Sequence, residues 1–223
     1  MPASVLPTLL VINPNTTASV TELVALHVKK AVGDRADIRA VTGSFGCAYI
    51  SSESCYAIAA HTALDSYASN EAGCDGVLLA CFGDPGLFAL QELSTVPVTG
   101  LAEACMFDAA ARGKRFSIVT GGVRWKPMLQ RLASALGLSP SLASVRPISL
   151  TGAQIADDPE ASLDMLIAEC NAAADEDSAQ EVILGGAGLA GLAERIQHRC
   201  HVRVLDSVLL GAEIAVRRIE AGD

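Results

Sequence analysis

The sequence has few aromatic residues and little positive charge. Phe, Trp and Tyr make up 4% of its 223 residues, and Trp125 is the one tryptophan. Lys and Arg total 16 against 25 Asp and Glu, which gives a formal net charge of −9, and no basic cluster stands out. Nucleic acids and anionic membranes require a positive surface, so neither is expected as a partner.

The sequence also lacks long apolar runs and metal-binding spacings. No apolar run approaches the roughly 20 residues of a membrane span, and no basic segment precedes an apolar one at the N-terminus, so we expect a cytoplasmic protein. The seven cysteines are an odd number without Cys-x-x-Cys spacing. This pattern argues against a disulfide framework and a zinc site, and it predicts reduced thiols. His198, Cys200 and His201 are expected in a surface turn, and no metal site is predicted.

Strand and helix patterns alternate along the chain, which is typical of a parallel sheet covered by helices on both faces. The predicted strands are 8–12, 38–41, the run beginning at 77, 96–100, 115–119, 144–148, the run beginning at 181, and 202–206. The predicted helices are 17–32, 52–72, 84–93, 101–111, 126–136, 159–175 and the C-terminal segment. Half of the residues are apolar and many are small, as close helix-on-sheet packing requires.

The second half repeats the order of elements in the first, and Gly-rich strand ends recur at matching places. We therefore predict an α/β fold of two similar Rossmann-like lobes, with parallel sheets related by a pseudo-twofold axis. The first lobe is expected to comprise 1–98 and 207–223, and the second 99–206. Ligands bind at the carboxyl ends of strands in such folds, so the cleft between the lobes is the predicted active site. Cys81 and Gly186 are expected to face each other across it.

Cys81 ends the most apolar run of the first half. Gly83, Asp84 and Pro85 follow, and they predict a helix that begins with Asp84 as its N-cap and Pro85 as its first residue. Cys81 would then face free N–H groups and the positive end of a helix, both of which favour the thiolate. The alternative is a small buried side chain at a strand end, which is a common environment for free cysteine.

Five runs of the sequence stand out as motifs: 11–17 (VINPNTT), 80–87 (ACFGDPGL), 97–104 (PVTGLAEA), 116–120 (FSIVT) and 184–189 (LGGAGL). Together they resemble the aspartate/glutamate/hydantoin racemase superfamily, and within it the hydantoin and allantoin racemase branch. The resemblance implies a cofactor-independent enzyme that removes a proton from a carbon next to a carbonyl. It also implies two cysteines, one on each half, which flank that carbon because inversion removes a proton on one face and delivers one on the other. Cys81 occupies the first position.

Gly186 occupies the position of the second cysteine. Glycine has no proton to give, so a symmetrical two-thiol racemisation cannot run on this sequence. Another residue or a water could serve the second face, with Cys47, Cys55 and Cys105 as candidates. Alternatively, the enzyme is a one-sided decarboxylase or lyase, a mirror arrangement of the arylmalonate decarboxylases, which protonate an enolate from one cysteine after carbon dioxide leaves. An inactive or engineered protein is the third explanation.

A thiolate can remove such a proton only if the enolate charge is stabilised, and preorganised N–H donors supply several kcal/mol of that stabilisation. The turns at the strand ends offer such donors, and Asn13 and Thr120 can orient carboxylate or imide oxygens. The predicted substrate-binding residues are Asn13, Phe82, Gly83, Thr120, Gly121, Gly122, Gly186 and Ala187. Each glycine could equally form only a tight turn, Asn13 could be a helix cap, and Trp125 could wall the cleft or simply pack.

The sequence therefore predicts an isomerase of the racemase type with Cys81 as its proton-transferring group and no cofactor. The expected substrate is a small carboxylate or cyclic ureide. The Ala-rich helices would permit a homo-oligomer. A non-catalytic accessory protein that retains the pocket is a further alternative.

Overall fold

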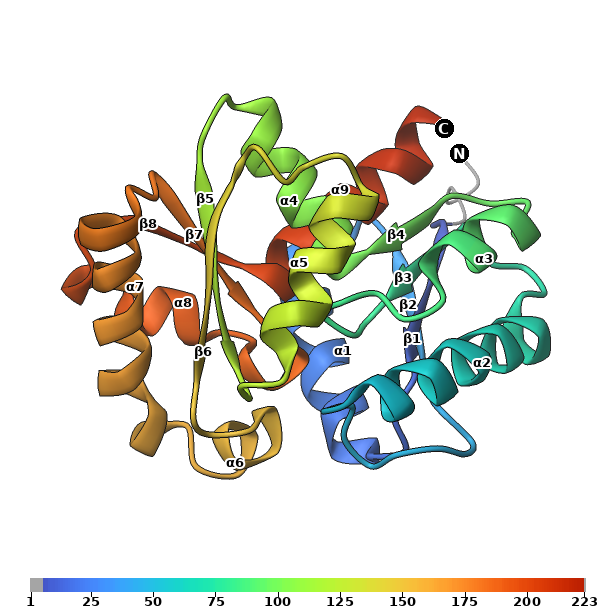
Figure 1. Cartoon of the computed structure of the whole chain (residues 1–223). Coiled ribbons are helices and arrows are strands. Elements are labelled where there is room, and N and C mark those ends of the chain that lie inside the picture. Colours follow the sequence, from blue (N-terminus) through green and yellow to red (C-terminus); the bar gives the residue numbers. More distant parts are fainter. Residues whose placement is uncertain (1–5, 223) are drawn as a thin grey trace.

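The computed structural model describes residues 6–222 and arranges them in two α/β lobes (Figure 1). The first sheet consists of β1 (Thr8–Asn13), β2 (Asp37–Thr42), β3 (Gly76–Leu79) and β4 (Val98–Gly100). The second consists of β5 (Phe116–Gly121), β6 (Leu142–Ile148), β7 (Glu181–Gly185) and β8 (Arg203–Asp206). All paired strands are parallel, in the orders β2-β1-β3-β4 and β6-β5-β7-β8. The same order occurs twice, and the predicted fold class is confirmed.

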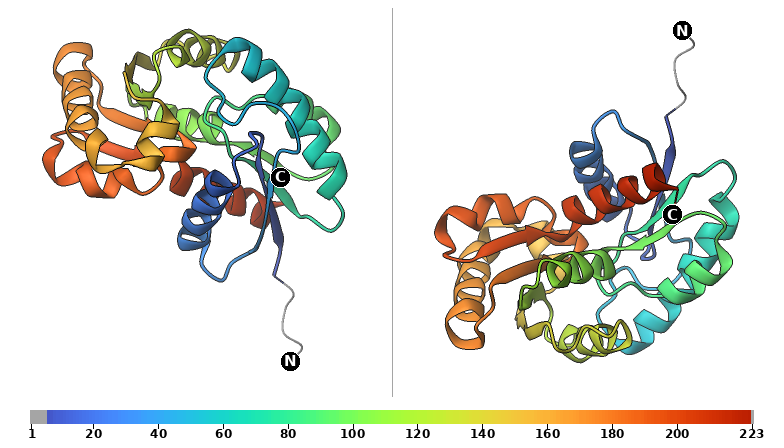
Figure 2. Two further views of the ribbon diagram at one scale, coloured as in Figure 1. Left: turned by 90° about the horizontal axis from the view of Figure 1, so that it is seen from below. Right: turned by 90° about the horizontal axis from the view of Figure 1, so that it is seen from above.

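The helices cover both faces of each sheet. Those nearest the first sheet are α1 (Ala18–Val32), α2 (Glu53–Asn70), α3 (Leu87–Leu93) and α9 (Ser207–Ala221). The others are α4 (Leu101–Ala111), α5 (Trp125–Ala135), α6 (Gly152–Asp157), α7 (Leu163–Asp177) and α8 (Leu192–Ile196). Short 3-10 turns lie at Glu160–Ser162, Ala187–Leu189 and Gln197–Arg199. Figure 2 shows the two lobes side by side, with helices on either side of each sheet.

The apolar run of β1 shows why the sheets are buried on both faces. Leu9 and Val11 pack into one core cluster with residues of α1 and α9, whereas Leu10 and Ile12 pack into another with residues of α2 and α3. Successive strand residues point to opposite faces, so a strand without polar alternation needs a helical layer on each side. This apolar pattern therefore places the sheet between two layers of helices.

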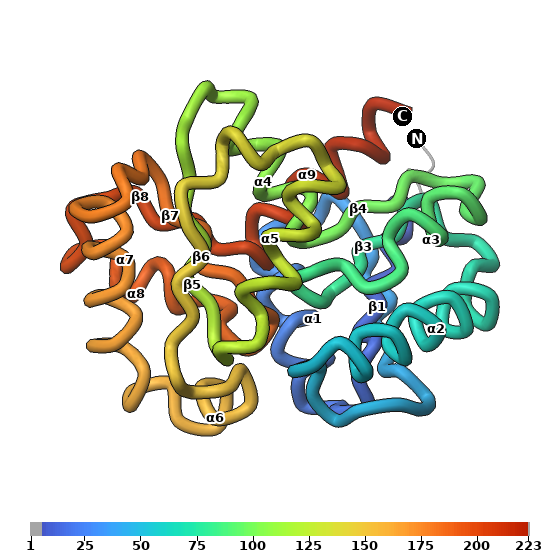
Figure 3. Tube along the Cα trace, viewed as in Figure 1, coloured from blue at the N-terminus to red at the C-terminus, as the bar shows by residue number. Residues whose placement is uncertain are grey.

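The chain crosses twice between the lobes, once through α4 and once from β8 into α9 (Figure 3). Helix α9 follows β8 of the second sheet but packs against α1, α4 and β3. One core cluster also includes Phe116 and Ile118 of β5 together with Val208 of α9. The lobes therefore share buried apolar surface beside the connecting helices, while the exact lobe boundaries at 98 and 206 stay a prediction.

The predicted start of the helix after Cys81 is wrong. Helix α3 begins at Leu87, after Gly86 in a left-handed conformation with φ 85°. Asp84 itself has φ 54°, and its carboxylate accepts the backbone N–H groups of Ala102 (3.0 Å) and Glu103 (2.7 Å). The carboxylate expected to cap its own helix thus caps α4, which lies far along the chain.

Two short helices, α6 and α8, were not predicted, and the helix expected from 159 begins instead at Leu163 after a 3-10 turn. Helix α6 carries a detectable signal, because Thr151 and Gln154 form a capping box at its start. At six residues, α6 is too short to show an apolar period. No helix in residues 6–222 is long and apolar enough to cross a membrane.

The expected surface turn near the C-terminal end of the second lobe is confirmed. His198 and His201 are exposed, and the Nε2 atom of His201 lies 2.9 Å from a carboxylate oxygen of Asp175. Residues 6–222 contain no cluster of three or more His, Cys, Asp or Glu side chains arranged to hold a metal ion.

The prediction of fully reduced cysteines is wrong, because Cys47 and Cys55 form a disulfide. Their Cα atoms lie 5.8 Å apart, since the loop before α2 turns back onto the first turn of that helix. The bond joins this loop to α2. The other five cysteines are free thiols: Cys74, Cys81, Cys105, Cys170 and Cys200.

We therefore expect five titratable thiols in the purified protein when it is denatured without reductant, and seven after reduction. The Cys47→Ser, Cys55→Ser double variant should show five in both conditions. Loss of this short cross-link should lower the free energy of unfolding by about 2 kcal/mol. Thiol titration in guanidinium chloride and urea unfolding measure the two effects, and seven thiols before reduction would contradict the disulfide.

Candidate functional site

A cavity lies where the carboxyl ends of the two sheets meet. Both lobes supply its walls, and seven of the nine predicted site residues line it. The lining residues are Asn15, Val20, Tyr49, Ile50, Ser51, Ala80, Cys81, Phe82, Thr120, Gly121, Gly122, Trp125, Thr151, Gly152, Gly186, Ala187, Gly188 and Leu189. Cys81 and Gly186 thus border the same space from opposite lobes, as expected. The two predicted residues that do not line it are Asn13 and Gly83.

Cys81 lies just beyond the end of β3, in the turn that faces this cavity. Its side chain is nearly buried, with 8% exposed. Burial raises the pKa of the Cys81 thiol well above its usual value, and the negative charge of Asp84 raises this pKa further. The expectation of a favoured thiolate is therefore wrong, since α3 begins only at Leu87 and a buried carboxyl group lies nearby instead. Burial and the charge of Asp84 therefore favour the protonated thiol of Cys81 over the thiolate.

Three contacts hold the turn that carries Cys81. The hydroxyl of Tyr56 donates a hydrogen bond of 2.9 Å to the carbonyl oxygen of Gly83. The ring of Trp125, from α5 in the other lobe, fills the space that a Cβ at Gly83 would need, and Gly83 has φ 123°. The ring of Phe82 in turn fills the space beside Gly185. Gly83 therefore lies behind the cavity wall. Because it has no side chain, residues of both lobes can pack closely against the turn.

Asn13 also lies behind the wall, and it orients Asn15. The Nδ2 of Asn13 donates to the Oδ1 of Asn15 (2.9 Å) and to Thr21 (2.9 Å). The Oδ1 of Asn15 also accepts the N–H of Thr17 (2.9 Å). These bonds occupy the carbonyl end of the Asn15 amide, and its Nδ2 has no acceptor within residues 6–222. Sequence reasoning selected Asn13 and missed Asn15, although both flank Pro14 at the same strand end.

Two of the backbone donors expected in the site are engaged elsewhere. The N–H of Gly122 donates to the carbonyl of Ile148 (3.1 Å), and that of Gly186 donates to the hydroxyl of Ser207 (3.3 Å). These two hydrogen bonds fix the positions of the two turns on the second lobe. The N–H groups of Gly122 and Gly186 are therefore not free to bind a ligand, and other groups of the cavity would have to do so.

Several lining groups have no hydrogen-bond partner among the described residues. They include the N–H groups of Phe82 and Ala187 and the hydroxyl of Thr120, a residue that is 4% exposed. Tyr49 and Ser51 add hydroxyls from the loop that the disulfide tethers, and burial and the charge of Asp157 raise the pKa of Tyr49. This arrangement offers donors to a ligand's carbonyl oxygens.

Within residues 6–222, no second thiol lines the cavity opposite Cys81. Gly186 has φ 147°, a backbone conformation that residues with side chains rarely adopt. Cys47 and Cys55 are joined to each other, and the fully buried Cys105 lies against the carbonyl oxygen of Ser207 at 3.7 Å. None of the three cysteines suggested for the second face lines the cavity.

Charged side chains are missing from the cavity wall as well. The lining residues of the described chain include no Asp, Glu, Lys, Arg or His. Among the described lining residues, the side chains that carry an exchangeable proton on sulfur or oxygen are those of Cys81, Tyr49, Ser51, Thr120 and Thr151.

Comparison with known proteins agrees with this geometry. Residues 9–215 match the profile of the family described as Asp/Glu/Hydantoin racemase. The chain belongs to this family. A hydantoin racemase from Pseudomonas sp. (strain NS671) is 34% identical over 95% of this chain and 86% of its own length.

Two allantoin racemases of known structure have the same fold as this protein. That from Pseudomonas fluorescens has a TM-score of 0.92 and 32% identity, and the match covers 96% of this chain and 92% of the other. That from Klebsiella pneumoniae has a TM-score of 0.89 and 32% identity, with coverages of 97% and 89%. The two-lobed racemase fold therefore extends over nearly the whole chain.

The contact between the Trp125 ring and Gly83 can be tested with a matched pair of glycine variants. Gly83 and Gly73 both have positive φ, but a Cβ at Gly73 would meet nothing within 4 Å. Gly73→Ala should lower the free energy of unfolding by about 1 kcal/mol, the cost of the left-handed backbone. Gly83→Ala should lower it by about 2 kcal/mol more, because Trp125 must move. Equal losses in urea unfolding would show that the Trp125 ring does not restrain the turn.

Proposed function

We propose that this protein is a cofactor-independent racemase-type enzyme in which Cys81 transfers a proton at a carbon next to a carbonyl group. The observation that carries the proposal is the position of Cys81, as the one thiol of a cavity whose described lining holds no charged side chain. The proposed substrate is a cyclic ureide such as a 5-substituted hydantoin, because a 34%-identical relative is named hydantoin racemase. A small carboxylate is the less favoured substrate, because no cation lines the cavity.

The chemistry requires that negative charge moves onto the carbonyl oxygen as the carbon loses its proton. The free N–H groups of Phe82 and Ala187 and the amide of Asn15 can donate to that oxygen, and preorganised donors of this kind lower such barriers by several kcal/mol. When Cys81 is protonated, its thiol donates a proton to the face of the substrate carbon that lies next to it. When Cys81 is a thiolate, it removes a proton from that same face.

The opposite face of the carbon meets the turn at Gly186. Inversion needs a proton exchanged there too, and glycine supplies none. The Gly186 turn borders the cavity, where a water molecule can bind, and the hydroxyl of Thr120 borders the same cavity. We propose that one of these oxygens exchanges the second proton.

The single thiol also favours a second candidate, a one-sided decarboxylase. In that reaction a substituted malonate loses carbon dioxide and leaves an enolate, and Cys81 delivers one proton to its carbon. A thiol whose pKa is raised by burial suits this role, because it is protonated at neutral pH. The product would be a single enantiomer, because Cys81 delivers the proton to only one face of the enolate carbon.

The racemase proposal predicts exchange of the carbon-bound hydrogen with solvent. In heavy water the enzyme should introduce deuterium at C5 of a hydantoin, and Cys81→Ala should lose this activity by at least about 100-fold, as expected for loss of an acid–base group. Cys74→Ala is the matched control, because Cys74 is a buried thiol outside the cavity. Exchange is followed by nuclear magnetic resonance or mass spectrometry. Unchanged exchange in Cys81→Ala, or no exchange in hydantoins, allantoin and acidic amino acids, would contradict the proposal.

The two candidates are separated by Gly186→Cys. If the enzyme is a decarboxylase, the wild type converts arylmalonates to one enantiomer, and the variant gains racemase activity because a thiol then stands on each face. A Cβ at this position would lie 2.9 Å from the Cδ1 atom of Leu189, so Leu189→Ala is added to make room. Absence of carbon dioxide release by the wild type excludes the decarboxylase.

A further inference from the structure

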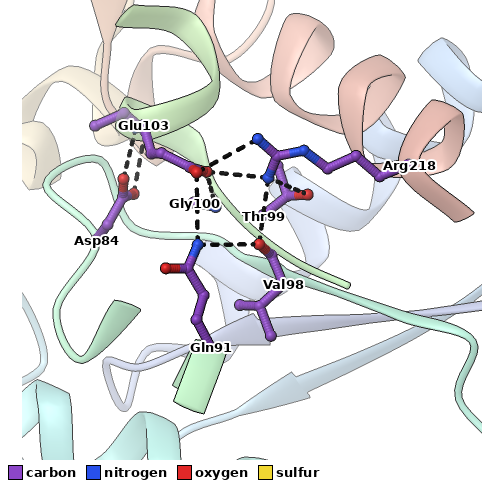
Figure 4. Close-up of polar contacts among 8 residues, drawn as sticks. Asp84, Gln91, Val98, Thr99, Gly100, Glu103 and Arg218 are labelled. Carbon is purple, nitrogen blue, oxygen red and sulfur yellow. Dashed lines mark hydrogen bonds and ion pairs between the residues drawn. The ribbon is translucent and has the colours of Figure 1, made fainter. Parts of the chain in front are cut away.

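The turn that carries Cys81 is anchored to the start of α4 by a buried carboxyl group. The Asp84 N–H donates to the carbonyl of Cys81 (2.9 Å), which closes the turn. The Asp84 carboxylate accepts the N–H groups of Ala102 and Glu103. Figure 4 shows Asp84 beside Glu103. Gly100 permits this approach, because a Cβ there would overlap the carboxylate. Asp84 is 1% exposed.

A second carboxylate at the same helix end, that of Glu103, forms an ion pair with Arg218. Glu103 accepts from both terminal nitrogens of Arg218, at 3.1 and 3.3 Å, and from the N–H of Gly100 at 3.3 Å (Figure 4). Gln91 also lies within 3.5 Å of Glu103. Within the described chain, no Lys or Arg forms an ion pair with Asp84, and backbone N–H groups at the start of α4 stabilise its charge.

We propose that Asp84 is a positioning residue, whose carboxyl group anchors the Cys81 turn and whose charge controls how readily the Cys81 thiol ionises. The inference rests on the proposed function only in treating Cys81 as the working thiol. Asp84 does not line the cavity, so it acts on a ligand only through Cys81.

The electrostatic environment supports this control. Burial raises the pKa of Asp84 to about 7, although its bonds to the α4 N–H groups lower it and the charge of Glu103 raises it further. The other titratable groups around it are Tyr56 from α2, Cys105 from α4 and Cys81 itself. We therefore expect Asp84 to ionise near neutral pH, and its anion to oppose formation of the Cys81 thiolate.

The test is the pH dependence of Cys81 alkylation by iodoacetamide, measured on the folded protein by peptide mass spectrometry from pH 5.5 to 9.5. An isolated thiol below its pKa reacts tenfold faster with each pH unit, because only the thiolate reacts. In the wild type this rise should flatten as Asp84 ionises near pH 7. A steady tenfold rise through that range would overturn the proposal.

Two variants show whether Asp84 causes the flattening. Asp84→Asn should remove it and speed Cys81 alkylation at pH 8 on the order of tenfold, because the buried charge is gone. Glu103→Gln should shift the flattening to lower pH, because one of the causes that raise the pKa of Asp84 is removed. Asp108→Asn, which removes a carboxylate from the other end of α4, should leave the profile unchanged.

The readout separates a merely structural role from the proposed one. If Asp84→Asn alkylates with the wild-type profile, Asp84 anchors the turn without controlling the thiol, and the proposal fails. If this variant does not fold, as judged by circular dichroism, the wild-type and Glu103→Gln profiles decide. Alkylation requires no turnover, so a flattened profile in a protein without solvent exchange would overturn the proposed function alone.

Discussion

The structure depends on the capping of α4 by a carboxylate from another segment. Asp84 belongs to the turn after β3, and its bonds to the first N–H groups of α4 hold that turn at the place where the chain passes from one lobe to the other. Phe82 and Gly83 meet Gly185 and Trp125 of the second lobe from the same turn. One short segment thus joins the lobes and presents the sulfur.

The cavity has one thiol, that of Cys81, among its described lining residues. Its described walls carry no charged side chain, and burial together with the charge of Asp84 raises the pKa of the Cys81 thiol. Neutral donors from Asn15 and from backbone N–H groups suit a ring with carbonyl and N–H groups, which is the chemistry of a cyclic ureide. The glycine opposite the sulfur makes the site asymmetric.

Much of the fold could be predicted from the sequence, because apolar runs such as 8–12 and the repeated order of strand ends are local patterns. The position of Cys81 at a strand end followed from the same rule. The bonds from the Asp84 carboxylate to α4 could not be predicted, because they depend on the packing of two segments that are far apart in the sequence. The same holds for the Cys47–Cys55 bond and for Asn15, whose free amide is apparent only from the bonds that Asn13 makes.

The most direct test of the central claim is a crystal structure of the protein with a bound 5-substituted hydantoin. The account predicts the ring in the cavity between the lobes, with C5 about 3.5 Å from the sulfur of Cys81. It also predicts that the other face of C5 points toward Gly186, with a water or the Thr120 hydroxyl in reach. A ring bound outside this cavity, or held with C5 turned away from the sulfur, would contradict it.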